Sequence, residues 1–432
     1  LMEDPWRPRR IELADGDLME EIGEARRIGR IGAGPPDLAD AGAQGIGQRK
    51  EPGTAFAPPG RALIAAIAFI LVPPDGAASY FLGLNRNKRG MALDLTQEAG
   101  RELLLRLLET ADVFIENFKT GTLERWGLGR EELERRFPRL VHCRISGFGA
   151  DGPLGGLPGY DAAIQASAGI MSVNGELGGA PLRVGLPVVD MVTGLNAVIG
   201  ILMALQERGS SGKGQFVETT LYDCGVSLLH PHLPNYYLSG KVAGRSGNAH
   251  PNITPYDVFA TRDAPLFLAV GNDRQFATLC KIVGRPELAQ DARYATNKDR
   301  NINRDALKAD LEAAMAGFDC GPLAERLVKS GVPCGAVRNI DEVMADPHTH
   351  HRGMVVDIGA YRGTGSPIKL SRTPATYRMA PPRFGEHTAA ILDEAGVQGE
   401  LFADALPGFA PADEAQGPET GAATTGRQKV HG

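Results

Sequence analysis

From about residue 79 onward, the apolar positions of this chain follow two alternating periods. The leucines within 103–108 fall on one face of a predicted helix, and Thr96 is expected to cap the N-terminus of that helix. Short apolar runs at 113–115 and 140–145 flank a charged helical segment at 131–137. Because alternation of helix and strand is typical of βαβ units, the pattern predicts an α/β fold with a mainly parallel sheet.

The alternation continues beyond the second strand. A helix is predicted near 162–171, a long apolar helix after Asp190, and a further strand within 215–221. Gly209 is expected to end the long helix, because glycine is the usual residue just past a helix C-terminus. These elements extend the same sheet.

After about residue 240 the pattern changes. Short strands are predicted near Val258 and at 266–270, with helices at 274–283 and 304–316. This combination is typical of a second, smaller α+β domain. A strand-like run at 354–358 then indicates a return of the chain to the first domain.

The chain thus divides into five predicted segments. Residues 1–75 are atypical, because clusters of glycine, proline and alanine interrupt every candidate element. The large domain begins at 76–235, the small domain occupies 236–345, and the chain returns to the large domain at 346–410. A tail at 411–432, rich in alanine, glycine, threonine and charge, is predicted to be disordered.

Composition narrows the class of protein. The 432 residues, 43% of them hydrophobic, are enough to bury a full core in two or more domains. The net charge of −6 offers no basic surface for nucleic acid. The longest apolar runs, 62–72 and 191–205, are shorter than the roughly 18–20 residues that cross a bilayer, so no membrane helix is expected. An acidic N-terminus without an apolar leader, together with five widely spaced cysteines, predicts a cytoplasmic protein.

Two motifs are rejected as cofactor or metal sites. Residues 147–152 match G-x-G-x-x-G, but Pro153 and further glycines follow, so no helix can start there to receive a dinucleotide phosphate. Histidines cluster near 230–232 and 348–351 without the i, i+4 spacing of a helical metal site. We therefore expect neither a metal nor an organic cofactor.

Asp190 is the most informative single residue. It is an acid between Val188-Val189 and Met191-Val192, directly before the long apolar helix. One interpretation is a helix cap that satisfies backbone N–H groups. The other is a nucleophile toward an activated acyl group, because a carboxylate at a helix N-terminus is favoured in its charged form. Both interpretations remain open from the sequence, and both can hold together.

Several ordered motifs are similar to those of the family III CoA-transferases, the CaiB/BaiF family. The resemblance runs from about residue 79 to 397 and includes Val189-Asp190. Its other motifs are L-N-R-N-K-R at 84–89, D-V-F-I-E-N-F at 112–118, G-Y-D at 159–161, G-K-G-Q at 212–215, G-N-D-R-Q-F at 271–276 and G-E-H-T at 385–388.

The resemblance implies a fold, an assembly and a reaction. The fold would be a Rossmann-like large domain with a smaller α+β domain, in a homodimer of two interlocked rings. Asp190 would attack an acyl-CoA and form an aspartyl mixed anhydride before CoA passes to a second carboxylic acid. CoA would be a substrate and no cofactor would be needed. Gly271 would belong to a flap over the active site, and the residues that contact CoA would be Leu93, Thr96, Asn117, Phe118, Arg125, Tyr160 and Asp161.

Two alternatives to an active transferase stay open. The family also contains 2-methylacyl-CoA racemases, which carry a histidine base where this chain has Tyr160. A tyrosine, with an unperturbed pKa of about 10, is a poor base at neutral pH, and this favours transfer. The second alternative is an impaired member, because residues 38–44 match the family's opening whereas 45–51 replace an expected strand, as a shifted reading frame or truncated gene start would produce.

The substrates are read from the resemblance alone. The motifs at 271–276 and 385–388 look closer to members that use dicarboxylic acids than to formyl-CoA transferase. Succinyl-CoA with a dicarboxylic acid is therefore the expected pair.

Overall fold

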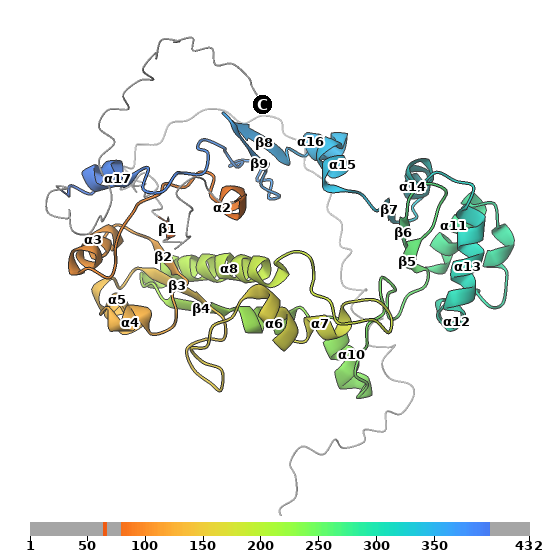
Figure 1. Cartoon of the computed structure of the whole chain (residues 1–432), viewed down its shortest axis with the longest axis horizontal. Coiled ribbons are helices and arrows are strands. Elements are labelled where there is room, and N and C mark those ends of the chain that lie inside the picture. The colour runs from red at the N-terminus through yellow and green to blue at the C-terminus, as the bar shows by residue number, and fades with distance from the viewer. Residues whose placement is uncertain (1–63, 67–78, 398–432) are drawn as a thin grey trace, which may run out of the picture. The chain divides into compact units, whose positions relative to one another are not determined.

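The computed structural model describes residues 64–66 and 79–397 (Figure 1). Its first layer is a four-stranded sheet in the order β1 (Ile64–Ala66), β2 (Val113–Glu116), β3 (Val141–Ser146) and β4 (Phe216–Thr220). All three strand pairs are parallel. The predicted parallel sheet is confirmed, and its first strand lies inside the segment 1–75 for which the sequence predicted no element.

The apolar pattern located α3 (Glu98–Leu108) but misplaced its cap. Leu103, Leu104 and Leu108 are buried, as predicted. The N-cap residue is Gln97, not Thr96. The amide and hydroxyl of Thr96 both donate to an Asp94 carboxylate oxygen, at 2.9 and 2.6 Å, so this short local turn delays the start of the helix.

The long helix α8 (Val188–Ser211) begins earlier and ends later than predicted. Glycine is tolerated at 209, and the helix ends at Gly212, which takes a left-handed φ of 76°. One face, made by Val189, Thr193, Ala197, Ile201 and Ala204, is buried. Part of this face packs against β2 and β3 through Val113, Val141 and Cys143.

The other helices of this part of the chain are short. The helix predicted at 162–171 is divided at Gly169 (φ 90°) into α6 (Asp161–Ser167) and α7 (Ile170–Val173). Other helices beside the parallel sheet or near it in sequence are α2 (Ser79–Leu84), α4 (Thr122–Arg125), α5 (Arg130–Arg136), α9 (Leu221–Ser227) and α10 (His232–Ser239).

Arg208 near the end of α8 fixes the direction of this helix on the sheet. Its guanidinium donates to the Asp112 carboxylate at 2.8 Å and to the Arg139 carbonyl at 2.8 Å, just before β2 and β3 begin. The C-terminus of α8 therefore lies at the amino ends of the strands. Its N-terminus lies at the opposite edge, where the strands end.

A second sheet is antiparallel, in the order β5 (Tyr256–Phe259), β6 (Leu266–Ala269) and β7 (Cys334–Ala336). Its core includes Leu268, Phe276 and Leu311, all buried. The helices around it are α11 (Asp273–Ile282), η1 (Pro286–Ala289), α12 (Asn297–Ile302), α13 (Arg304–Met315) and α14 (Cys320–Lys329). The strands and helices predicted here are confirmed, while the domain boundaries stay predictions.

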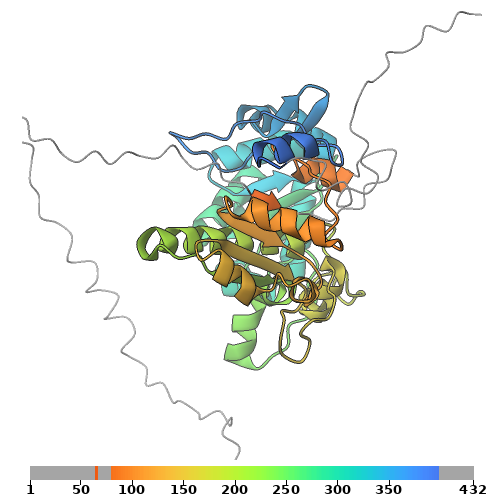
Figure 2. The ribbon, with the colours of Figure 1, turned by 90° about the vertical axis from the view of Figure 1, so that its left-hand side faces the viewer.

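The last described segment runs back to the first helices of the chain. After α15 (Ile340–Ala345) and α16 (Pro347–His351) come the hairpin β8 (Val355–Ile358) and β9 (Tyr361–Thr364), then α17 (Thr388–Glu394). Leu392 and Val397 pack against Leu103 of α3. Both α17 (blue) and α3 (orange) lie toward the viewer in Figure 2. The Ala92 amide also donates to the Thr388 hydroxyl at 3.0 Å. The predicted tail lies outside the described residues.

Candidate functional site

The candidate site lies at the edge of the parallel sheet where the strands end. Asn117 and Phe118 follow β2, and the segment that reaches Asp161 follows β3. Asp190 lies in the first turn of α8, which starts at this same edge. Ligands of parallel α/β sheets bind at the carboxyl ends of the strands. The fold therefore brings residues from three distant parts of the sequence to the edge at which such sites form.

A close contact between two glycines brings the G-Y-D segment to the end of β3. A Cβ atom on Gly147 would lie 2.7 Å from the Gly159 nitrogen, and one on Gly159 would lie 3.0 Å from the Gly147 Cα. Only glycine permits backbones to approach so closely. Tyr160 and Asp161 follow directly, and Asp161 begins α6.

Asp161, not Asp190, caps the long helix. Its Oδ2 accepts the amide hydrogens of Val189 at 2.8 Å and of Asp190 at 3.1 Å. Asp190 is the third residue of α8, so interpreting it as the N-cap is wrong. Within the described residues, the Asp190 carboxylate accepts no hydrogen bond, and its side chain is exposed. This carboxylate is available for chemistry.

Two effects oppose ionisation of Asp190. Neighbouring groups remove part of its solvation shell, although the residue is exposed, and this desolvation raises the pKa of its carboxyl. The negative charge of Asp161 raises the pKa further. A carboxylate with a raised pKa is the more basic and more nucleophilic one once it is ionised.

A buried ion network holds the predicted CoA-contacting segment after β2. Glu116, only 2% exposed, accepts the Phe118 amide at 2.8 Å and the Arg144 Nε at 2.6 Å. Arg144 also donates to Glu124 at 2.7 Å, the residue before Arg125 in α4. Sequence reasoning missed Glu116 and Arg144. An acid at the end of an apolar strand, facing an arginine of the next strand, was the available signal.

The structure places the remaining predicted residues in different surroundings. Leu93 and Phe118 pack against the same apolar cluster. The rings of Phe118 and Trp126 contact edge to face, with their centres 5.6 Å apart. Exposed Asn117 lies between Glu116 and Phe118, and exposed Arg125 donates to the Thr122 hydroxyl at 3.0 Å. Thr96 is also exposed, and 84% of the Tyr160 surface is accessible.

Gly271 belongs to the antiparallel part of the chain. Its amide donates to the Gln275 side chain at 2.9 Å, and Asn272 caps α11 by accepting the Gln275 amide at 3.0 Å. Among the described residues, no hydrogen bond links Gly271 to Asp190. The segment that the resemblance identifies as a flap is thus the structured start of a helix.

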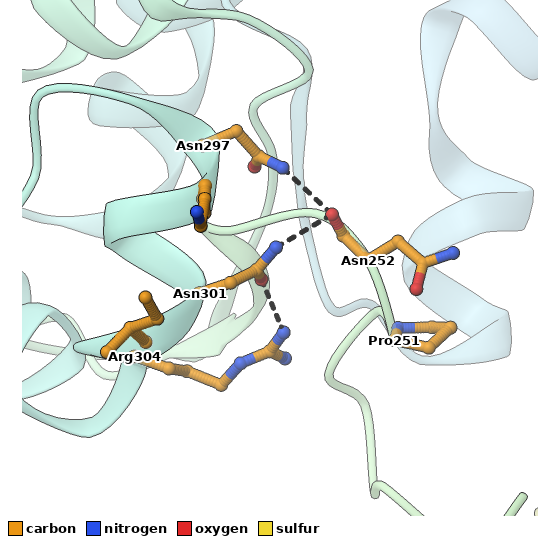
Figure 3. A pocket seen from close by; sticks show the side chains of 7 residues that line it. Pro251, Asn252, Asn297, Asn301 and Arg304 are labelled. Carbon is orange, nitrogen blue, oxygen red and sulfur yellow. Dashed lines mark hydrogen bonds between the residues drawn. The ribbon is translucent and has the colours of Figure 1, made fainter. Parts of the chain in front are cut away.

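A hollow of about 510 Å³ lies away from Asp190, beside α12 (Figure 3). Asn297 and Asn301 both donate to the Asn252 carbonyl, at 2.9 and 2.8 Å. Arg304 donates to the Asn301 side chain at 2.8 Å and to the His250 carbonyl at 2.9 Å. These polar groups hold the 250–252 loop to α12, so the hollow has a structural explanation.

Neither a metal nor a thiolate offers a rival centre in the part of the chain that the structure describes. No group of three His, Cys, Asp or Glu side chains there is arranged to hold a metal ion. All five cysteines are free and mostly buried. Desolvation raises the pKa of Cys143 to about 11 and that of Cys280 to about 12, which disfavours the nucleophilic thiolate.

Comparisons with known proteins agree on one family. The family model for CoA-transferase family III matches residues 38–388. A succinate–glutarate CoA-transferase of Agrobacterium fabrum is 40% identical over 323 residues, which cover 74% of this chain and 81% of that protein. An acetyl-CoA:oxalate CoA-transferase of Acetobacter aceti is 37% identical, over 73% of this chain and 82% of that one.

A solved structure shows the same relationship. The crystal structure of a CaiB/BaiF family protein from Brucella suis matches with a TM-score of 0.68 and 42% identity, covering 76% of this chain and 86% of that one. The resemblance predicted from the motifs is confirmed.

Proposed function

Because the chain belongs to CoA-transferase family III and is an enzyme, we propose that Asp190 is the nucleophile by which it moves CoA between an acyl-CoA thioester and a carboxylic acid. The observation that carries this proposal is the exposed Asp190 carboxylate at the strand-end edge, whose own helix is capped by another residue. A nucleophile that also served as a cap would lose its structural hydrogen bonds at each acylation.

The chemistry needs only the carboxylate and the two substrates. An Asp190 oxygen attacks the thioester carbon, the C–S bond breaks, and CoA leaves as a thiolate. The donor acyl group then remains on Asp190 as a mixed anhydride. The thiolate attacks the Asp190 carbonyl and releases the donor acid, leaving CoA on Asp190 as a thioester. The acceptor carboxylate attacks the Asp190 carbonyl of this thioester, expels the thiolate and forms a second mixed anhydride. The thiolate then attacks the acceptor carbonyl of that anhydride, which releases the new acyl-CoA and restores the Asp190 carboxylate.

The CoA moiety is proposed to bind along the segments after β2 and β3. Asn117, Phe118 and Arg125 would contact it, because the Glu116–Arg144–Glu124 network fixes both ends of that segment. Leu93, which packs against the same apolar cluster as Phe118, is a further proposed contact. Thr96, Tyr160, Asp161 and Gly271 are proposed contacts from the family resemblance. The large domain would be Rossmann-like, and no cofactor would be required.

We propose succinyl-CoA and a dicarboxylic acid as the substrate pair. Support comes from the Agrobacterium fabrum relative, which is named for succinate and glutarate. The test is a screen of acyl-CoA donors against mono- and dicarboxylic acids, with new thioesters identified by mass spectrometry. Transfer from succinyl-CoA to a dicarboxylic acid is expected. Exclusive use of monocarboxylic acids would contradict the substrate class, and no transfer with any pair would favour an impaired member.

The racemase alternative finds no support at Tyr160. The tyrosine ring is largely exposed, and a histidine base is absent from the position that the racemases use. We expect no deuterium incorporation at the α-carbon of 2-methylacyl-CoA in deuterated water. Rapid incorporation would establish the isomerase reaction instead.

The outer face of α8 is proposed to pack against a second copy of the chain, in an interlocked homodimer that works in the cytoplasm. The helix α8 is longer than the apolar run at 191–205, so the expectation that no helix is long and apolar enough to cross a membrane is wrong by length and composition alone. Its inner face, however, is buried in the protein. Contiguous apolar patches on a protein surface commonly mark an interface. The exposed apolar side chains of this face are Met191, Leu195, Val198, Ile199, Leu202 and Met203.

A pair of charges tests this interface. The double variant Leu195→Glu/Leu202→Glu is expected to have the light-scattering mass of one chain, whereas the unmodified protein has that of two. Val328→Glu, on the exposed face of α14, is the matched control and should remain dimeric. A monomeric unmodified protein that partitions onto lipid vesicles would contradict the proposal.

A further inference from the structure

A chain of hydrogen bonds with a fixed polarity leads to the first turn of α8. Gln165 is completely buried. Its Oε1 accepts the Val184 amide at 2.8 Å, and its Nε2 donates to Asp161 Oδ1 at 2.6 Å. Because Val184 offers only an N–H, the Gln165 amide cannot be reversed without burying two facing donors. Its NH₂ group must therefore point at Asp161, which must accept.

Asp161 in turn holds the backbone at Asp190, the proposed nucleophile. While its Oδ1 is occupied by Gln165, its Oδ2 accepts the amides of Val189 and Asp190. Both oxygens of the carboxylate thus have protein donors. The buried Gln165 side chain fixes the position of Asp161 through Oδ1, and Asp161 in turn fixes the backbone of Asp190 through Oδ2.

We propose that Asp161, oriented by Gln165, is a positioning residue that holds the Asp190 carboxylate in its attacking geometry. This role takes the place of the CoA contact that the family resemblance implies for Asp161, because both oxygens of its carboxylate already accept hydrogen bonds from the protein. The inference rests on the proposed function, because it takes Asp190 as the nucleophile.

The same arrangement has an electrostatic consequence. Helices α6 and α9 both pack against the start of α8 and carry Asp161 and Asp223 respectively, and Arg183 precedes α8 and donates to the Val184 carbonyl. Of these charges, Asp161 is the one that raises the pKa of Asp190, after desolvation. Removing the Asp161 charge should therefore lower the pKa of Asp190 and extend activity to more acidic pH.

The polarity of the hydrogen bonds allows a sharp pair of variants. In Asp161→Asn, the amide NH₂ faces the Gln165 NH₂ when its oxygen caps α8, so one contact must break. In the double variant Asp161→Asn/Gln165→Glu, the Asn amide donates to the new carboxylate, which still accepts the Val184 amide. The double variant restores the hydrogen bond between residues 161 and 165, although it loses the 3.4 Å contact of the Gln165 amide with the Leu186 carbonyl. It also moves the negative charge from residue 161 to residue 165.

Asp223→Asn is the matched control. It removes one carboxylate from the first turn of α9, whose cap is the Thr220 hydroxyl accepting the Asp223 amide at 3.0 Å. The change leaves the hydrogen bonds of Asp161 and Gln165 untouched. We expect this variant to keep the kcat, KM and pH profile of the unmodified enzyme.

The measurements are kcat and KM for acyl-CoA across acidic and neutral pH, and the titration of the Asp190 carboxyl by ¹³C NMR, assigned with Asp190→Asn. Asp161→Asn should lower kcat at neutral pH by about tenfold with KM within about twofold, and the double variant should recover most of kcat. Both should lower the pKa of Asp190. A higher KM with unchanged kcat in Asp161→Asn, failure of the double variant to recover kcat, or an unchanged Asp190 titration would each overturn the inference. The NMR titration needs no turnover. An enzyme in which Asp190→Asn stays active would overturn the proposed function separately.

Discussion

Two charged side chains of this protein, Arg300 and Asp190, lie in opposite surroundings. Arg300 on α12 is fully buried, and its guanidinium donates to the carbonyls of Thr254 and Tyr294 at 2.8 and 3.0 Å. It also donates to the Asp273 carboxylate at 2.7 Å and lies 4.6 Å from the centre of the Phe276 ring. Asp190 on α8 is exposed, accepts no hydrogen bond among the described residues and lies beside a second acid.

This difference distinguishes a charge that stabilises the fold from a charge that is available to react with a substrate. A buried charge whose three nitrogens each donate a hydrogen bond to the protein fixes the loops that it touches. A carboxylate with a raised pKa and unoccupied oxygens keeps its reactivity for an incoming group. The two centres should therefore respond to substitution in opposite ways, one in stability and the other in turnover.

Substituting the proposed nucleophile gives the largest expected effect. Asp190→Asn should lower kcat by at least ~10³-fold, because the amide cannot form the anhydride. The free energy of unfolding should change by no more than about 0.5 kcal/mol, because Asp161 caps the helix and Asp190 does not. Steady-state transfer and urea unfolding measure the two quantities. A large loss of stability would show that Asp190 has the structural role.

Substituting the buried arginine should give the reverse pattern. Arg300→Met leaves the buried Thr254 and Tyr294 carbonyls without their donor, so we expect a loss of about 2–4 kcal/mol in the free energy of unfolding. The kcat of the folded fraction should stay near that of the unmodified enzyme. Arg285→Met, which breaks an exposed pair with Glu287, is the control and should cost less than about 1 kcal/mol. Equal effects of the two substitutions would contradict the comparison.

An intermediate effect is expected at Glu116, which is buried and also adjoins the proposed CoA site. Glu116→Gln weakens the contact to Arg144 and should reduce the free energy of unfolding by about 1.5–3 kcal/mol. Because the Phe118 amide loses its charged acceptor, the KM for acyl-CoA should rise more than kcat falls. If kcat alone changes, the segment after β2 does not bind CoA.

The smallest effect concerns pH and stability. A carboxyl whose pKa is raised in the folded state destabilises the fold above that pKa, and this destabilisation disappears as the pH falls below the ordinary value near 3.8. Asp190→Asn should therefore be slightly more stable than the unmodified protein at neutral pH, with the difference vanishing in acid. Thermal unfolding at a series of pH values measures this. A difference that grows toward acidic pH would contradict the direction of the shift.

The apolar periodicity predicted the elements but not their ends. The leucines of α3 and the apolar runs of β2 and β3 can be recognised in the sequence, because burial of one face or both faces of an element imposes a pattern on its apolar positions. The helix ends depend on local competition. Asp94 captures Thr96 before it can cap α3, and α8 continues through Gly209 because Gly212 supplies the left-handed residue.

The candidate site was predicted as residues but not as an arrangement. Asp190 and Asp161 were both singled out, yet their relationship depends on a contact between residues 29 apart in the chain. The close contact of Gly147 and Gly159 and the buried Gln165 produce that contact, and no local period reports them. The roles of Glu116 and Arg144 likewise depend on the pairing of β2 with β3, which places the two residues opposite each other.

If Asp190 is the nucleophile, it carries the acyl group during each turnover. The most direct test is to incubate the protein with succinyl-CoA, quench with hydroxylamine and map the modified residue by peptide mass spectrometry. We expect a hydroxamate at Asp190 that depends on acyl-CoA and is absent from Asp190→Asn. A hydroxamate at another residue, or transfer that proceeds with no modification of Asp190, would contradict it.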